Sequence, residues 1–393
     1  MSQHDIVILS AARTPMGSMQ GELADLAGHE LGAHAIKAAV EHAKIDGAKI
    51  EDVLMGCVLP AGQGQAPARQ AALGAGLPTH VPCTTVNKVC GSGMRTVMMA
   101  HDQLKLGHIK FAIAGGMESM TNAPYLLKNG RSGYRFGHNT VYDHMTLDGL
   151  EDAYAHKAMG EFGELCADKY QFTREAQDAF ALTSVNRAKE ATENGLFENE
   201  VVAITLKTRK GDVLVDSDEG PRRAMPDKIP NLRPAFTKDG TITAANASSI
   251  SDGASALVLA RADAAEAEGL KPLARIVAHA THAQAPEWFT TAPVGAIEKV
   301  LKHANWKIDD VDLFEINEAF AVVTMAAMKE LAIPHEKVNV HGGACALGHP
   351  IGASGARIIT TLVHALHAHG KKRGIAALCI GGGEATAIAI EVM

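Results

Sequence analysis

The sequence predicts an α/β fold built from two copies of one unit. Residues 35–56 and 296–317 resemble each other, because both run from a helical pattern through K-I-(E/D)-D-V into an apolar run. Residues 113–119 (IAGGMES) and 379–385 (CIGGGEA) also correspond, and each follows a Gly-rich turn and an apolar helical pattern. Short β-branched runs alternate with helical periods in both copies, which is typical of α/β domains. The period is too long for a solenoid and indicates a duplicated domain.

The individual elements follow from the spacing of apolar residues. Apolar side chains at helical intervals predict a helix at 94–106, directly after the turn CGSGMR. Buried strands are expected where short apolar runs occur, at 6–12 and 111–116 in the first copy and at 273–281 and 374–383 in the second.

A region of different composition separates the two copies. It is richer in charged residues, Gly, Asn and Asp, and we interpret it as an insertion with its own small core. Its clearest element is an amphipathic helix that starts at Thr173 and ends at Asn194-Gly195. The predicted domains are a first half (1–118 plus 251–270), the insertion (119–250) and a second half (271–393).

The composition excludes several classes of protein. With 393 residues, of which 47% are hydrophobic and 21% charged, the chain is typical of a soluble globular protein. A net charge of −7 argues against a nucleic-acid-binding protein. No run reaches the roughly 20 apolar residues of a membrane span, and no signal peptide precedes the first apolar run, so we expect a cytoplasmic protein. The six cysteines form no C-x-x-C pair and no zinc-site spacing, so free thiols and no metal are expected.

Cys90 is a candidate nucleophile. The segment VNKVCGSGMR places it at the end of an extended run and directly before a Gly-Ser-Gly turn that opens a helix. The free N–H groups and the positive dipole end of a helix favour the thiolate, so the pKa of Cys90 is expected to fall below its ordinary value. The alternative is a buried cysteine beside the start of a helix.

Three further segments hold candidate catalytic groups. His349 lies between a glycine and a proline before a helical pattern, where a rigidly held imidazole suits a general base, although a surface turn is the alternative. Cys379 ends an apolar run and precedes three glycines, whose N–H groups suit an oxyanion hole or simply a tight turn between strands. Asn317 ends another run, where it can orient a water, and the adjacent Glu318 is interpreted as a cap of the following helix.

The two copies differ at these reactive positions. Aligning the V-N dipeptide that each copy carries before its Gly-rich turn places Cys90 opposite Gly342. Aligning the glycine turns places Cys379 opposite Ile113. Equivalent ends of strands and helices therefore carry different chemical groups, which is what a single site shared between two halves requires.

These segments resemble the thiolase family along the whole chain, from SAARTPMG near the N-terminus to the C-terminal strand. The marks of the resemblance are VCGSGM around Cys90, GGMESM, NEAFA, GHPIGASGAR and CIGGGEA, in the order that the family has them. The resemblance implies a thiolase-like fold, in which two βαβαβ-type halves pack in α-β-α-β-α layers and carry an inserted loop domain. It also implies an acyl-CoA C-acyltransferase, which condenses two acetyl-CoA to acetoacetyl-CoA and CoA or cleaves a 3-ketoacyl-CoA with CoA.

The same resemblance implies roles for the candidate residues. Cys90 matches the nucleophile that carries the acyl group, His349 matches the base that activates it, and Cys379 matches the acid/base that handles the α-proton. Asn317 with a bound water, together with His349, matches one oxyanion hole. The backbone N–H groups of Cys90 and Gly381 match the second.

A coenzyme A site is implied as well, because CoA is substrate and product and no other cofactor is needed. Arg222 in DEGPRR would meet the nucleotide part of CoA, with a solvated loop charge as the alternative, and Ser248 in ANASSISDGA would lie near the pantetheine. Met159 and Phe320 are expected to contact the substrate. Ala158 stands where many family members have a histidine, a departure that bears on the preferred acyl chain.

The sequence leaves two alternative functions open, and the resemblance also implies an oligomeric state. A ketoacyl-synthase-type condensing enzyme would carry His or Asn where this chain has Cys379. A catalytically inert, thiolase-like acyl-CoA-binding protein would lack one of the reactive groups. Family members are dimers or dimers of dimers, so a homotetramer is expected, with residues 125–145 as the contact between dimers.

Overall fold

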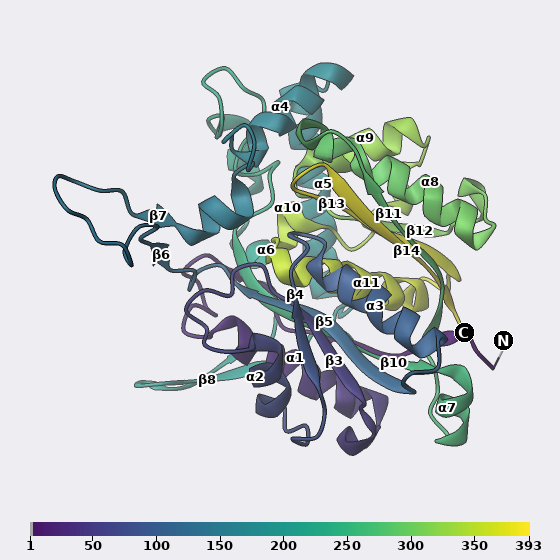
Figure 1. The fold of residues 1–393 in the computed structure, drawn as a ribbon. Coiled ribbons are helices and arrows are strands. Elements are labelled where there is room, and N and C mark those ends of the chain that lie inside the picture. The colour runs from purple at the N-terminus through teal and green to yellow at the C-terminus, as the bar shows by residue number, and fades with distance from the viewer. Residues whose placement is uncertain (1–2) are drawn as a thin grey trace.

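The structure, a computed structural model, describes residues 3–393 and is built on one large mixed β-sheet (Figure 1). The strands of the first half are β1 (Ile6–Arg13), β3 (Asp52–Gly56), β4 (Cys83–Val86), β5 (Phe111–Ser119) and β10 (Ser251–Arg261). They lie in the order β4-β3-β5-β10-β1. β3 is parallel to β4 and β5, whereas β10 is antiparallel to β5 and β1. The short β2 (Gly17–Ser18) pairs with β10.

The second half repeats this order. Its strands are β11 (Ala274–Ala283), β12 (Leu313–Ile316), β13 (Arg373–Ile380) and β14 (Glu384–Val392), and they lie in the order β12-β13-β14-β11. β12 is parallel to β13, and β14 is antiparallel to β13 and β11. A parallel bridge from Phe314 to Val338 takes the position of β4. The predicted duplication is confirmed, and the two halves join where β1 pairs with β11.

Helices cover both faces of each half (Figure 1). α3 (Ser92–Lys105) and α11 (Ile351–Ala368) pack against each other and share one core with strands of both halves. The outer helices are α1 (Gly28–Ala43) and α2 (Pro67–Gly74) on the first half and α8 (Ala292–Ala304) and α9 (Ala321–Glu330) on the second, and the short helices are α7 (Ala262–Ala267) and α10 (Ala344–Leu347). The predicted α-β-α-β-α layers are therefore confirmed. None of the helices in residues 3–393 is long and apolar enough to cross a membrane.

The two central helices approach each other through glycines at equivalent positions. A Cβ atom on Gly93 would lie 2.8 Å from the backbone nitrogen of Ala356, and one on Gly355 would lie 2.3 Å from the backbone nitrogen of Met94. Any larger side chain would push the closely packed helices apart, so the crossing requires glycine at both positions. The contact is reciprocal, because the pair Gly93-Met94 meets the pair Gly355-Ala356.

The structure corrects the register of the repeat. The pairings of β3 and β12 with their neighbouring strands place Cys379 opposite Met117, not opposite Ile113. The reciprocal helix crossing places Cys90 opposite Gly352, a different glycine from the one expected. The alignment of the V-N dipeptides failed because the connection before α11 is longer than its counterpart and includes α10, and the alignment of the glycines failed because they lie inside β5 but after β13. The conclusion drawn from that alignment holds, since neither counterpart carries a thiol.

The inserted region has helices α4 (Met159–Tyr170), α5 (Arg174–Glu193) and α6 (Glu219–Arg223) and strands β6 (Tyr125–Leu126), β7 (Tyr142–Asp143), β8 (Ile204–Thr208) and β9 (Gly211–Val215). The predicted start of α5 is confirmed, because the Thr173 hydroxyl accepts a hydrogen bond from the Ala176 N–H at 3.2 Å. The apolar residues of the insertion pack with one another and also with the second half, so its core is shared. Apolar residues of α4 pack with α9, and those of α5 pack with Leu347 of α10. The apolar faces of the insertion are complementary to the second half, which a local pattern does not reveal.

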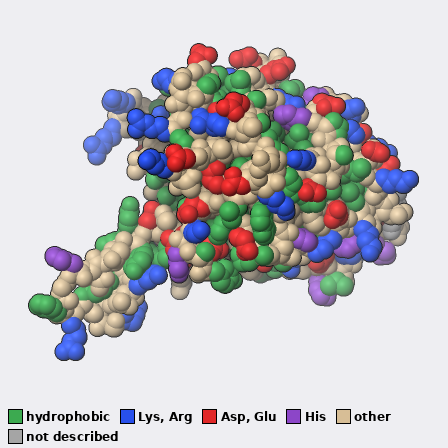
Figure 2. Space-filling model, turned by 90° about the horizontal axis from the view of Figure 1, so that it is seen from above, with side chains coloured by type: hydrophobic (Ala, Val, Ile, Leu, Met, Phe, Trp, Pro, Cys, Tyr) green, Lys and Arg blue, Asp and Glu red, His purple; other side chains and the backbone are tan. Residues whose placement is uncertain are grey.

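One segment of the insertion projects from the body of the molecule (Figure 1). It lies between β6 and β7, and Figure 2 shows it as a knob that carries hydrophobic, basic and histidine side chains. Phe136 is fully exposed there, and Tyr125 is 70% exposed. These are large apolar side chains to leave in water, so the knob is suited to contact another surface.

We predict that Gly355→Ala destabilises the protein by about 1–3 kcal/mol, because the added methyl group must displace the backbone of α3. The midpoint of urea unfolding measures the effect. Gly130→Ala is the matched control, since its Cβ atom would lie 3.3 Å or more from its neighbours in an exposed loop. Equal stability of the two variants would contradict a crossing that depends on glycine.

Candidate active site

Cys90 sits in a strained turn between β4 and α3. The preceding Val89 has a φ angle of 45°, in the left-handed region that β-branched residues avoid. Two polar side chains hold this conformation. Asn87 Oδ1 accepts a hydrogen bond from the Val89 N–H at 2.9 Å, and the Ser92 hydroxyl accepts one from the Lys88 N–H at 2.8 Å. Backbone strain of this kind costs about 1–3 kcal/mol and fixes the direction in which the next side chain points.

The β13–β14 hairpin brings Gly381 against Cys90. The backbone N–H groups of Gly381 and of Cys90 itself both face the Cys90 sulfur. The approach is close, because a Cβ atom on Gly91 would lie 2.3 Å from Cδ1 of Ile380. The three glycines form the turn between two strands, and Gly381 also presents its N–H group to the sulfur, so the role of this N–H in an oxyanion hole stays a prediction.

The pKa of Cys90 contradicts the expectation from the helix N-terminus. Burial raises this pKa to about 11, although the N–H groups of Gly381 and Cys90 act in the opposite direction. Removal of the sulfur from water therefore outweighs the local dipoles. The resting sulfur is a neutral thiol at neutral pH, and it needs a base to become a nucleophile.

His349 is a buried residue held at the start of α11. It is 6% exposed, which excludes the surface-turn alternative, and its backbone N–H donates to the Ser249 carbonyl at 3.1 Å. Gly348 before it has a φ angle of 99°, and Pro350 after it is the N-cap residue of α11. Burial and the nearby charge of Arg357 lower the pKa of His349 to about 3. The imidazole is therefore neutral at physiological pH and able to accept a proton.

The hydrogen bonds of the imidazole indicate which nitrogen is free. The Ser354 hydroxyl donates to the Pro350 carbonyl at 3.0 Å, and its oxygen lies 2.5 Å from Nδ1 of His349. Because the hydroxyl proton is already engaged, Nδ1–H of His349 donates to the Ser354 oxygen. This assignment leaves Nε2 as the unprotonated nitrogen that can act as a base.

Asn317 directly follows β12 and lies beside His349. Its side-chain nitrogen is 3.5 Å from the ring nitrogens of His349, and its Oδ1 is 3.5 Å from a guanidinium nitrogen of Arg357. The backbone N–H of Asn317 donates to the Ala377 carbonyl of β13. The strand pairing thus places Asn317 in register with the strand that ends at Cys379.

Cys379 lies at the buried end of β13 with an apolar wall behind it. It packs in one cluster with Phe320 and Phe289, whose ring centroids are 6.4 Å apart. Burial raises the pKa of Cys379 well above its ordinary value, and the neighbouring Cys90 contributes in the same direction. The two thiols are therefore close enough to influence each other, and both are protonated at neutral pH. All six cysteines of the chain are free.

The remaining sequence-predicted residues lie at different places. A Cβ atom on Gly381 would lie 3.5 Å from the Met159 sulfur, so Met159 borders the site. The backbone N–H of Ser248 donates to the Ala319 carbonyl, beside Phe320. The next residue, Ser249, accepts the backbone hydrogen bond of His349, so Ser248 belongs to the segment that holds His349 in place.

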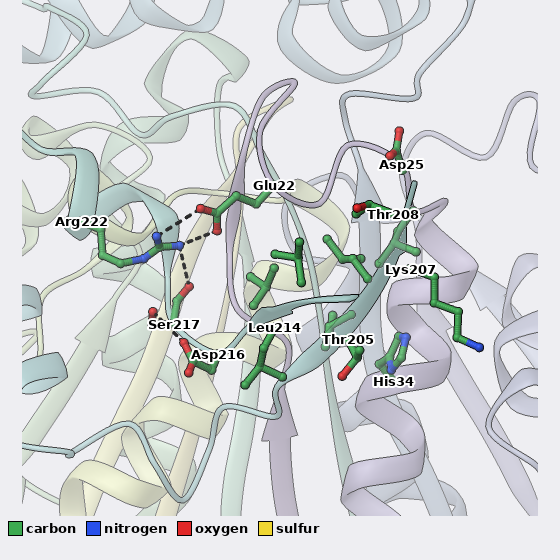
Figure 3. A pocket seen from close by; sticks show the side chains of 15 residues that line it. Glu22, Asp25, His34, Thr205, Lys207, Thr208, Leu214, Asp216, Ser217 and Arg222 are labelled. Atoms are coloured by element: carbon green, nitrogen blue, oxygen red, sulfur yellow. Dashed lines mark hydrogen bonds and ion pairs between the residues drawn. The ribbon is translucent and has the colours of Figure 1, made fainter. Parts of the chain in front are cut away.

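Arg222 lies apart from this group, on a cleft of about 700 Å³ beside β8 and β9 (Figure 3). Its guanidinium binds both carboxylate oxygens of Glu22, at 3.1 and 2.5 Å, and also contacts the Ser217 carbonyl. Its side chain is 41% exposed. No contact with the reactive groups is present within the described residues, and the role of Arg222 toward CoA stays a prediction.

Glu118 is a residue whose importance the sequence analysis missed. It is fully buried in β5, and its carboxylate accepts hydrogen bonds from the N–H groups of Val58, Leu59 and Gly352 at 2.9–3.1 Å. Burial raises its pKa to about 7, against the effect of these three donors. The carboxylate fastens the start of α11 to the loop after β3 beside Cys90. The motif GGMESM contained the residue, but nothing local indicated that its partners lie on distant segments.

Glu318 has a different role from the one expected. Its carboxylate accepts hydrogen bonds from the Ser184 hydroxyl at 2.7 Å, from Asn339 Nδ2 at 2.8 Å and from the Cys345 N–H at 3.0 Å. No side chain caps α9. The prediction that Glu318 caps that helix is wrong, because the carboxylate turns instead toward α5 and the start of α10.

Comparisons with known proteins agree with this arrangement. The model of the thiolase N-terminal domain matches residues 6–263, and that of the thiolase C-terminal domain matches residues 270–392. A probable acetyl-CoA acetyltransferase from Dictyostelium discoideum is 50% identical over 98% of this chain and 94% of its own. A mitochondrial acetyl-CoA acetyltransferase from Rattus norvegicus is 49% identical over 99% of this chain and 91% of its own.

Two solved structures extend the similarity to three dimensions. The acetyl-CoA acetyltransferase of Bacillus anthracis superposes with a TM-score of 0.96 at 41% identity, over 99% of both chains. The Acat5 thiolase of Ascaris suum, solved in complex with coenzyme A, superposes with a TM-score of 0.94 at 41% identity, over 99% of this chain and all of its own. The duplicated halves and the site between them agree with these matches. The matches establish that the chain belongs to the thiolase family.

Proposed function

We propose that this protein is an acetyl-CoA C-acetyltransferase, which condenses two acetyl-CoA to acetoacetyl-CoA and also catalyses the reverse thiolysis. One observation carries the proposal: the partly exposed thiol of Cys90 neighbours the buried thiol of Cys379 and precedes α3, which packs against α11, the helix that follows the neutral imidazole of His349. Acyl transfer needs a nucleophile, and carbon–carbon bond formation needs a second acid/base while that nucleophile is occupied. The relatives named acetyl-CoA acetyltransferase support the same reaction.

In the first step, Nε2 of His349 removes the proton from Cys90. The sulfur attacks the thioester carbonyl of acetyl-CoA, the bond to the CoA sulfur breaks, and the proton passes to the leaving CoA. Because the neutral thiol and neutral imidazole are both stable when buried, the charged pair forms only as the reaction proceeds. Ser354 supports this step by fixing the ring proton on Nδ1.

In the second step, Cys379 passes its proton to the imidazole of His349, which is neutral again, and the resulting thiolate removes a proton from the methyl group of a second acetyl-CoA. The enolate attacks the acetyl carbonyl on Cys90, which forms acetoacetyl-CoA and releases the Cys90 sulfur, and that sulfur takes the proton back from His349. In thiolysis the steps run in reverse, and Cys379 donates its proton to the departing carbanion. A raised pKa suits this role, because the thiol keeps its proton until it is needed.

Negative charge develops on an oxygen atom in both steps. The N–H groups of Gly381 and Cys90, which face the sulfur, are suited to stabilise the oxygen of the acetyl group on Cys90. Asn317 with a water, together with His349, is suited to stabilise the enolate oxygen of the second substrate. A donor of this kind is worth about 3–4 kcal/mol of transition-state stabilisation.

Coenzyme A is the proposed partner of the remaining residues. Met159 and Phe320 border the reactive groups and are suited to contact the acetyl and pantetheine parts, with Ser248 beside them. For Arg222 to bind a CoA phosphate, it must exchange Glu22 for the phosphate. We also infer a homotetramer that assembles through residues 125–145, supported by the exposed Phe136. A location in the cytoplasm stays a prediction.

We predict that Cys90→Ser lowers the rate of acetoacetyl-CoA thiolysis at least about a thousandfold, because the hydroxyl is a far weaker nucleophile. The loss of absorbance of the acetoacetyl-CoA enolate measures the rate. With CoA withheld, mass spectrometry should find an acetyl group on the Cys90 peptide of the unaltered protein. Cys83→Ser is the matched control and should keep full activity. An unacetylated Cys90 would refute the mechanism.

We predict that Cys379→Ser separates the two steps. The variant should still exchange acetyl groups between acetyl-CoA and labelled CoA, because that exchange uses only Cys90 and His349. Condensation should fall at least about a hundredfold, since the hydroxyl is a poor base for the α-proton. Isotope exchange and acetoacetyl-CoA formation measure the two steps separately. Equal losses in both would contradict the division of labour.

We predict that iodoacetamide alkylates Cys90 at a rate that rises about tenfold for each pH unit from 7 to 9. With a pKa of about 11, the thiolate fraction stays small and grows in proportion to hydroxide across this range. Peptide mass spectrometry of timed samples measures the rate at Cys90. A plateau below pH 8 would mean that the helix start, and not burial, determines the pKa.

A further inference from the structure

A second cluster of polar side chains lies at the opposite end of α3 from Cys90. His101 and Asp102 occupy the last turns of this helix, and His279 reaches them from β11 of the other half. Asp102 Oδ1 lies 3.0 Å from Nδ1 of His101 and 2.9 Å from Nε2 of His279. The two ring nitrogens are 3.2 Å apart. Among residues 3–393, this is the one group of three potential metal-binding side chains whose ligand atoms lie within 4.8 Å of one another.

We propose that His101, Asp102 and His279 form a binding site for a divalent transition metal, best suited to Zn²⁺. Two imidazole nitrogens and one carboxylate oxygen are a ligand set that zinc uses in proteins. A tetrahedral zinc with bonds of about 2.0–2.1 Å requires neighbouring ligand atoms to lie about 3.3 Å apart. The three observed separations of 2.9–3.2 Å therefore form one face of such a tetrahedron. Water completes the fourth position.

The protonation states of the cluster favour metal binding. Burial lowers the pKa of His101, so its ring is neutral and carries a lone pair at physiological pH. The pKa of Asp102 is lowered even though burial opposes the shift, because both histidines donate hydrogen bonds to it. The carboxylate is therefore ionised. Metal binding replaces ring protons that now point at the carboxylate, and the two rings turn their lone pairs to the ion.

Access and placement agree with the proposal. The side chain of Asp102 is 53% exposed, whereas those of His101 and His279 are 15% and 18% exposed. The nitrogens are thus held firmly, and the fourth position faces water. The rings meet edge to face with centroids 4.8 Å apart, and one nitrogen of each lies close to the same oxygen of Asp102. A bound ion would fasten α3 of the first half to β11 of the second, far from the reactive thiols.

Zinc binding by full-length protein tests the proposal. Accessible thiols are first alkylated with iodoacetamide, because cysteine sulfur also binds zinc. Isothermal titration with ZnCl₂ then compares the unaltered protein with His279→Gln and with Asp102→Asn. We expect one zinc equivalent in the unaltered protein that binds at least about tenfold more weakly in each variant. Zinc should raise the melting temperature of the unaltered protein but not that of His279→Gln or Asp102→Asn.

His108→Gln is the matched control, because His108 is exposed just beyond α3 and lies outside the cluster. It should bind zinc as the unaltered protein does. If all four proteins bind alike, or if His108→Gln loses the site as well, zinc binds elsewhere and the proposal is wrong. If none binds zinc, the three side chains form a hydrogen-bonded group only, and the proposal is equally wrong. Asp102→Asn alters an exposed side chain, so the test does not depend on the folding of His279→Gln.

Discussion

The close crossing of α3 and α11 is the constraint on which the rest of the structure depends. Each half supplies a helix whose start carries reactive groups, Cys90 before α3 and His349 before α11. Those starts can meet only if the helix backbones approach within the reach of a side chain, and Gly93 and Gly355 allow that approach. The duplication then has a chemical use. Two related scaffolds face each other, and each contributes groups that its counterpart lacks.

Burial determines the electrostatics of the site that this crossing creates. Cys379 and His349 are buried and Cys90 is largely shielded from water, so all three favour their neutral forms in the resting protein. The three reacting groups therefore carry no charge until substrate arrives. The fixed donors are the backbone N–H groups of Cys90 and Gly381, which are positioned before any negative charge develops. The strained φ angle of Val89 is one energetic cost of that positioning.

Local patterns predicted the elements well. The helix expected at 94–106 spans Ser92–Lys105, and the one expected from Thr173 spans Arg174–Glu193, because helix starts and apolar spacing are local properties. The placement of Cys90 and His349 before helices was also correct. The pKa of Cys90 was not predictable, since it depends on segments far away in the sequence that exclude water. The extent of the insertion's core was not predictable for the same reason, because its apolar residues pack with the second half as well as with one another.

The wide separation of the cluster's residues in the sequence explains why the sequence predicted no metal site. The prediction considered cysteine spacing, and no motif joins His279 to Asp102, which is 177 positions away. Their meeting depends on β11 lying beside the end of α3, which follows from the same crossing that builds the active site. One arrangement therefore has two consequences at opposite ends of α3. At the start of the helix, buried neutral groups from both halves gather around a sulfur. At its end, partly exposed groups from both halves gather around a point that suits a cation, because the hydrogen bonds from both histidines keep Asp102 charged.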